Sequence, residues 1–169
     1  MNTSQIHSIL TCIIPSHQCL FLGVFPKDLI PSIQSSSSFP LCFVANTDPS
    51  TQAGEHWVAY FYYSPSYLEF FDSYGLSPSD YDLPHKPQRM NHQTLQSLDS
   101  RVCGHYCIFY LYHRSQGISL TRILSSFSLH DYTWNDRHVS RFISKNFTHH
   151  CSKCTLTTHC QCCVSRNKK

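Results

Sequence analysis

The chain has 169 residues, 41% hydrophobic and 14% charged, a composition typical of one globular domain with a modest core. Its formal net charge of +3 permits contact with nucleic acid but does not favour it over ordinary surface charge. No apolar run approaches the ~18 residues of a membrane span, and the N-terminus lacks the basic residues of a signal peptide. We therefore expect an intracellular protein, in cytoplasm or nucleus, with no membrane partner.

Short apolar elements alternate with polar turns in the first half of the chain. Apolar residues at helical spacing predict a short helix over 6–14, followed by a buried extended stretch over 20–26. Residues 41–46 are a short apolar run and predict a buried strand. Two runs rich in β-branched and aromatic residues, 56–63 and 67–72, predict an antiparallel hairpin.

The second half of the chain is expected to be mainly helical. Residues 77–95 contain several prolines and little periodicity, which predicts an irregular loop. Apolar spacing predicts one helix over 103–113 and two more that begin near Ser119 and Asn135. This order of elements predicts an α+β domain over residues 1–147.

The hairpin brings two polar residues to its open end. With a three-residue turn at Ser64–Ser66, paired residue numbers sum to 130, so His56 lies opposite Tyr74, and Asp72 is a diagonal neighbour of His56 on the same face. A two-residue turn would place His56 and Asp72 on opposite faces. The pattern thus permits, without requiring, a carboxylate that orients the imidazole and stabilises its charged form.

Cys103 is the candidate nucleophile because it stands at the start of a predicted helix. A helix N-terminus stabilises anions, and a protonated His56 nearby would lower the pKa of the thiol further. The Cys103 backbone N–H and the side-chain amide of Gln96 would supply two donors to an oxyanion, and Gly104 would let a substrate backbone approach closely. Taken alone, a cysteine at a helix start is usually a small buried hydrophobic residue. We expect that role for Cys107, which lies one helical turn after Cys103.

The chemistry rests on one ordered set of residues: His56, Asp72, Gln96 and Cys103. This set resembles the catalytic residues of adenovirus proteases and of the related SUMO and ubiquitin-like proteases. Gly54–Ala59 is similar to their G-x-H-W motif, Phe70–Gly75 to their second strand, and Phe21–Phe25 to the adenovirus-type F-L-G-x-[FY] start. The interval of seven from Gln to Cys matches the adenovirus branch better, and Asn135–Ile143 resembles homologues from virus-like DNA transposons.

The resemblance implies a papain-like cysteine protease fold, with a central mixed sheet and the nucleophile at a helix N-terminus. It implies that His56 is the general base and Asp72 its orienting carboxylate. Gln96 is then an oxyanion donor and Cys103 the nucleophile of an acyl transfer through a thioester. Family substrates commonly have small residues or Gly before the scissile bond, which a narrow cleft walled by Trp57 would suit.

Two departures from adenovirus proteases stand out. Asp72 occupies a position where those enzymes usually have Glu, a chemically mild change. They are also activated by a peptide that forms a disulfide with a cysteine in the loop before the Gln, whereas residues 77–95 contain no cysteine. We therefore expect no required cofactor, and neither peptide nor DNA activation is implied for this chain.

Residues 148–169 form a Cys- and His-rich basic tail. Four of its side chains are candidate ligands for a structural Zn²⁺: Cys151, Cys154, His159 and Cys162. The spacing falls one residue short of a zinc knuckle, which would need a cysteine where Val164 stands. A disordered extension is the alternative, and the basic end would either contact nucleic acid or form a solvated tail.

Three functions remain open from the sequence. The first is a thiol endopeptidase that processes a viral or transposon polyprotein, with a protein substrate carrying Gly near the scissile bond. The second is a deconjugating isopeptidase for SUMO or another ubiquitin-like protein. The third is a catalytically inactive protease fold used as a binding module, against which the intact set of four residues argues.

Overall fold

A mixed five-stranded sheet forms the centre of the computed structural model, with strand order β1-β2-β3-β4-β5. The outer pairs β1–β2 and β4–β5 are parallel, and the inner pairs β2–β3 and β3–β4 are antiparallel. The strands are β1 (Leu20–Phe25), β2 (Leu41–Asn46), β3 (Trp57–Ser64), β4 (Tyr67–Phe71) and β5 (Arg89–Met90). The expected central mixed sheet is confirmed.

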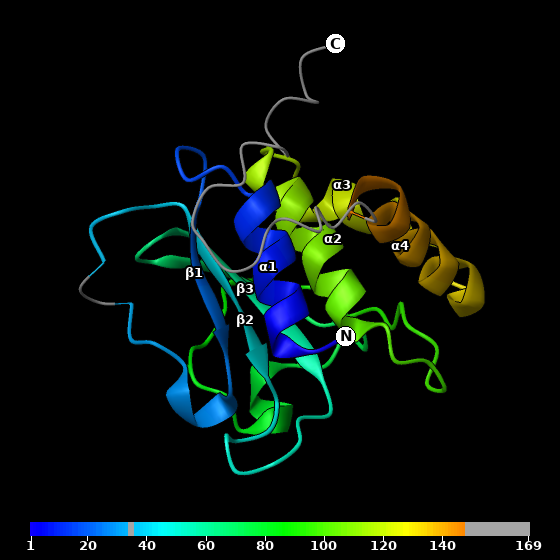
Figure 1. The fold of residues 1–169 in the computed structure, drawn as a ribbon, viewed down its shortest axis with the longest axis horizontal. Helices are drawn as coiled ribbons and strands as arrows, with labels where there is room; N and C mark the ends of the chain where they lie inside the picture. The colour runs from blue at the N-terminus through cyan, green and yellow to red at the C-terminus, as the bar shows by residue number, and fades with distance from the viewer. Residues whose placement is uncertain (34–35, 148–169) are drawn as a thin grey trace, which may run out of the picture.

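Helices follow the strands in sequence, except for one helix at the N-terminus. They are α1 (Thr3–Ile13), α2 (Cys103–Ser115), α3 (Leu120–Leu124) and α4 (Tyr132–Phe147), with 3-10 turns η1 (Lys27–Leu29) and η2 (Pro78–Tyr81). Figure 1 shows α1 and α2 side by side against the sheet, with α3 and α4 beyond α2. The α+β class predicted from the sequence is confirmed.

The structure describes residues 1–33 and 36–147. The predicted Cys- and His-rich tail and its four candidate zinc ligands lie outside these described residues. Within the described part of the chain, no helix is long and apolar enough to cross a lipid bilayer.

Two helices begin earlier than their apolar spacing predicts, because polar residues cap them. α1 starts at Thr3, where Asn2 Oδ1 accepts the Gln5 backbone N–H at 2.9 Å and the Gln5 side chain accepts the Asn2 N–H. α4 starts at Tyr132 rather than near Asn135, since Asp131 Oδ1 accepts the Trp134 N–H at 2.8 Å. Cap residues, and not the inward-facing apolar residues, therefore set where these two helices start.

Both faces of the sheet are buried, so its inner strands are apolar without strict alternation. Cys42 and Val44 of β2 face the cluster under α1 and α2, whereas Phe43 faces a second cluster on the opposite side. There Phe43 stacks on Tyr60 at 4.6 Å between ring centroids. The expected burial of residues 20–26 is wrong for most of β1, which is half-buried because it forms the sheet edge.

The hairpin has the predicted register, although its turn differs. Pairs from Ala59–Phe71 to Tyr62–Leu68 sum to 130, but Ser64 then pairs with Tyr67 and leaves a two-residue turn. The register shifts between Tyr62 and Ser64, so one extra residue on β3 compensates for the shorter turn. The open end of the hairpin is therefore arranged as the three-residue turn would have placed it.

A buried ion pair ties α2 to the sheet. Arg114 Nε lies 2.7 Å from Glu69 Oε2, and the Tyr110 hydroxyl donates to the same oxygen at 3.2 Å. The Arg114 guanidinium also lies over the Phe61 ring, 4.4 Å from its centroid. These contacts join α2 to β3 and β4, the same strands that carry the polar residues at the open end of the hairpin.

Replacing Glu69 with Ala is expected to lower the free energy of unfolding by about 3–5 kcal/mol, because it leaves a buried guanidinium unpaired. Urea denaturation of wild type and variant measures the difference. The matched control is Asp82→Asn, which removes an exposed ion pair with Lys27 and should leave stability nearly unchanged. A Glu69→Ala variant as stable as the control would show that the buried Arg114–Glu69 ion pair does not stabilise the fold.

Candidate active site

His56 and Asp72 meet at the open end of the hairpin. His56 directly precedes β3 and Asp72 directly follows β4. Both side chains are buried, and His56 Nε2 lies 2.5 Å from Asp72 Oδ1. The contact that the register permitted is present, and it leaves the other imidazole nitrogen, Nδ1, free to face a different group.

The Asp72 carboxylate is held from several directions. Besides His56, Oδ1 accepts the Tyr74 backbone N–H at 3.1 Å. Oδ2 accepts the Leu76 backbone N–H at 2.9 Å and the Tyr81 hydroxyl at 3.0 Å. Four donors thus fix both oxygens of a fully buried carboxylate, which fixes the orientation of the imidazole in turn.

Cys103 is the first residue of α2, as predicted. Burial raises the pKa of its thiol, but a hydrogen bond to His56, the imidazolium charge and nearby backbone N–H groups hold the pKa below its ordinary value. Burial lowers the pKa of His56, but Asp72 and Cys103 raise it to about 9. These opposed shifts favour an imidazolium–thiolate pair near neutral pH.

One turn along α2, Cys107 fixes the helix against the sheet. It is buried, as predicted, and its Sγ donates to the Trp57 backbone carbonyl at 3.3 Å. Burial raises the pKa of this thiol well above its ordinary value. Cys107 is therefore a structural cysteine, and its bond to the residue after His56 helps to hold Cys103 and His56 at a constant separation.

The structure gives Gly104 and Trp57 packing contacts that the sequence did not predict. A Cβ at Gly104 would lie 3.0 Å from Ile6 Cδ1, so the small residue lets α1 and α2 approach closely. The expected approach of a substrate backbone at Gly104 stays a prediction. Trp57 is half-buried, and its indole N–H donates to the Met1 carbonyl at 3.3 Å. The cleft wall expected from Trp57 stays a prediction.

Gln96 reaches the site because its loop is held against the end of β4. Gly75 has φ +76°, and a Cβ there would lie 2.8 Å from the Gln93 backbone, so a side chain would push the two segments apart. The backbone N–H groups of Leu95 and Gln96 both donate to the Ser73 carbonyl, at 2.8 and 3.1 Å. The turn after Asp72 therefore holds the loop that contains Gln96, the candidate oxyanion donor, against the site.

The partners of the Gln96 side chain set the direction of its amide. Its Oε1 accepts the Ser73 hydroxyl at 2.8 Å. Its Nε2 donates to the Ser100 carbonyl at 3.0 Å and to the Tyr74 hydroxyl at 3.3 Å. The amide nitrogen thus points toward Tyr74, whose ring stacks on His56 at 4.7 Å between centroids.

Two polar side chains that fix Asp72, and one that fixes the Gln96 loop, were not predicted from the sequence. Tyr81 and Asn91 come from the segment read as an irregular loop, and Asn91 Nδ2 donates to the Asp72 backbone carbonyl at 2.5 Å. Asn135 of α4 is fully buried and donates to the Leu95 carbonyl at 2.9 Å. Asn135 was predicted only as the position near which a helix begins, and nothing in its spacing indicates the bond to Leu95.

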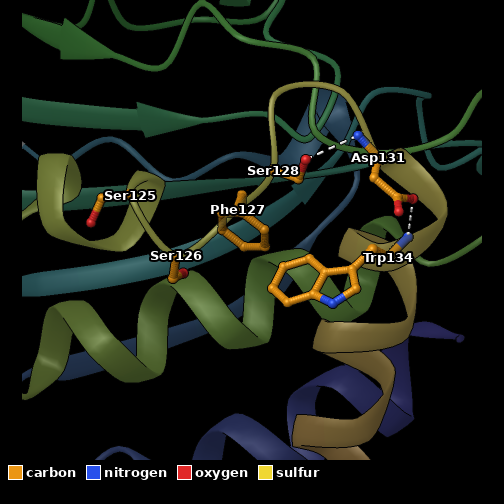
Figure 2. Close-up of a pocket in the computed structure, with 6 residues that line it drawn as sticks. All are labelled: Ser125, Ser126, Phe127, Ser128, Asp131 and Trp134. Atoms are coloured by element: carbon orange, nitrogen blue, oxygen red, sulfur yellow. Dashed lines mark hydrogen bonds between the residues drawn. The ribbon is translucent and has the colours of Figure 1, made fainter.

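No other group of residues in the described chain makes a comparable site. Within residues 1–33 and 36–147, no three His, Cys, Asp or Glu side chains gather to hold a metal ion. A pocket of about 410 Å³ at the junction of α3 and α4 contains none of the predicted site residues (Figure 2). It is lined by Ser125, Ser126, Phe127, Ser128, Asp131 and Trp134.

The fold and the His–Asp–Cys arrangement define a papain-like cysteine protease fold of the adenovirus type. The chain is 27% identical to the protease of Bovine adenovirus C serotype 10, over 54% of this chain and 56% of that protein. The predicted resemblance to adenovirus proteases is confirmed by this similarity. No protein-family model matches the sequence.

Two solved structures share the fold. The crystal structure of ASFV pS273R protease has a TM-score of 0.55 and 18% identity, and covers 80% of this chain and 66% of that one. Its selenomethionine crystal structure has a TM-score of 0.51 and 19% identity, with the same coverage. The chain spans little more than half the length of the adenovirus protease and about two thirds of the ASFV protease.

Replacing His56 with Ala should raise the pKa of the Cys103 thiol, because it removes both a hydrogen bond and a positive charge. Alkylation of Cys103 by iodoacetamide at pH 7 should slow roughly tenfold for each unit of pKa increase. Mass spectrometry across a pH series gives the rate, with exposed Cys12 as the reference in the same sample. A Cys103 titration unchanged by the substitution would contradict the ion pair.

Proposed function

We propose that the protein is a cysteine endopeptidase that hydrolyses peptide bonds through a thioester. The observation that carries this proposal is the position of His56, whose imidazole contacts Asp72 and whose pKa is raised by both Asp72 and the Cys103 thiol. A reactive cysteine needs a lowered pKa and a positioned proton acceptor, and this site has both.

The reaction follows from the positions of the side chains. The Cys103 thiolate attacks the scissile carbonyl carbon. The resulting oxyanion accepts hydrogen bonds from the Cys103 backbone N–H and from the Gln96 side-chain amide. The His56 imidazolium donates its proton to the amine, which leaves as the tetrahedral adduct collapses to a thioester. His56 then removes a proton from water, which attacks the thioester and releases the acid and the thiolate.

Similarity to the adenovirus and ASFV proteases supports peptidase activity. The identity of the substrate is a separate proposal. The relatives are proteases of adenovirus and ASFV, so a viral or transposon polyprotein with Gly near the scissile bond is the substrate class that we propose. All four donors to the Asp72 carboxylate come from this chain. We propose that the enzyme requires neither a peptide activator nor a cofactor. Contact with nucleic acid stays a prediction from the charge.

Replacing Cys103 with Ala should abolish hydrolysis, because it removes the proposed nucleophile, the thiol that interacts with His56. The assay is cleavage of fluorogenic peptides with Gly before the scissile bond, scored by mass spectrometry of the products. The matched control is Cys12→Ala, which removes an exposed cysteine from α1 and should retain wild-type activity. Full activity in the Cys103→Ala variant would remove the proposal.

One observation favours the isopeptidase alternative. The residue that orients His56 is Asp72, and SUMO proteases have Asp where adenovirus proteases usually have Glu. Vinyl sulfone probes built on SUMO and on ubiquitin test this alternative, because covalent labelling requires both a reactive thiol and a bound ubiquitin-like domain. We expect Cys103 to react with a Gly-ending peptide vinyl sulfone and not with either protein probe; the opposite pattern would establish the alternative.

A catalytically inactive binding module is the remaining reading. It requires that His56 and Cys103 fail to interact, whereas the imidazole hydrogen-bonds the thiol and raises its acidity. A wild-type protein that cleaves no peptide and reacts with no probe, but whose fold is intact, would favour it.

A further inference from the structure

We propose that the Tyr74 hydroxyl is a third donor to the oxyanion, which makes Tyr74 a catalytic residue of the proposed peptidase. The inference rests on the proposed function and extends it to a residue that no motif identifies. Tyr74 lies two residues beyond Asp72, in the turn that Gly75 completes, and is half-buried at the edge of the site.

Tyr74 touches three members of the candidate catalytic set. Its ring stacks on the His56 imidazole, with 4.7 Å between centroids and 26° between planes. Its backbone N–H donates to Asp72 Oδ1 at 3.1 Å, and its hydroxyl accepts from Gln96 Nε2 at 3.3 Å. The side chain therefore bridges the base and the predicted oxyanion donor across the mouth of the site.

The amide of Gln96 is already occupied on both of its N–H groups. One donates to the Ser100 carbonyl at 3.0 Å, and the other reaches the Tyr74 oxygen. The Ser73 hydroxyl fixes the amide oxygen, so the amide cannot reverse without losing that 2.8 Å bond. Gln96 is thus arranged to hold the phenol in place at least as much as to meet a substrate.

The phenol remains able to donate. Because the Tyr74 oxygen accepts a hydrogen bond from Gln96, its own O–H proton is not used in that contact, and the bond it receives makes this proton a better donor. Burial, followed by the negative charges of Cys103 and Asp72, raises the pKa of Tyr74, so the phenol stays protonated at neutral pH. The Cys103 charge acts on this phenol, so the neutral donor lies within electrostatic reach of the position where an oxyanion on the Cys103 adduct would form.

Replacing Tyr74 with Phe separates this role from the stacking role, because Phe keeps the ring against His56 and removes only the hydroxyl. We expect kcat for a Gly-containing peptide to fall by about 100-fold, the effect of losing one oxyanion donor, with KM little changed. The affinity for a peptide ending in glycinal should weaken as well, since its adduct with Cys103 places an oxygen at the same position. Alkylation by iodoacetamide, which forms no oxyanion, should stay within about twofold of wild type.

The matched control is Tyr63→Phe, which removes a hydroxyl from an exposed tyrosine on β3 and should leave all three readouts unchanged. A Tyr74→Phe variant with wild-type kcat and aldehyde affinity overturns the inference alone. Equal losses in hydrolysis and alkylation also overturn it, because Tyr74 would then act only through the ion pair. A wild type that neither hydrolyses peptide nor binds aldehyde, while Cys103 still alkylates, overturns the proposed function and this inference together.

Discussion

The hydrogen bond between His56 and Asp72 is the contact on which the rest of the site depends. It joins the residue before β3 to the residue after β4, so it forms only if the hairpin keeps its register. A slip by one residue would send the two side chains to opposite faces of the sheet. The compensating shift near Ser64 at the far end of β3 therefore matters to chemistry at the open end.

Burial of this pair imposes a condition on its surroundings. A fully buried carboxylate is tolerated only where donors replace the lost water, and four donors surround Asp72. Two of them come from the backbone of the turn after β4, and the Tyr81 hydroxyl comes from η2. The segment between β4 and Gln96 thus stabilises the Asp72 carboxylate at its start and positions Gln96, the candidate oxyanion donor, at its end.

Patterns within short stretches of sequence predicted the features that depend on neighbouring residues. Alternation predicted the two strands of the hairpin and permitted the contact of His56 with Asp72, but the contact depends on an extra residue near Ser64 that the sequence did not predict. Helical spacing was enough to start α2 at Cys103. Contacts made across many residues had no such signature: the Asn91 bonds to the Asp72 backbone and the Asn135 bond to Leu95 depend on the tertiary path. The contact of Gly104 with α1 was not predicted for the same reason, because α1 lies almost a hundred residues earlier in the chain.

The hydrogen bonds of Gln96 and Tyr74 decide which of the two side chains has a proton left to donate. The spacing from Gln to Cys resembles the adenovirus branch, yet here both N–H groups of the amide are engaged within the protein. To donate to a substrate oxygen, this amide must first break one of the hydrogen bonds that its N–H groups already make, which costs free energy. A phenol that receives one of those bonds and retains its own proton avoids that loss. In the proposed mechanism, the short turn from Asp72 through Gly75 holds both the carboxylate that orients the imidazole and the phenol that donates to the oxyanion, so one segment positions both groups.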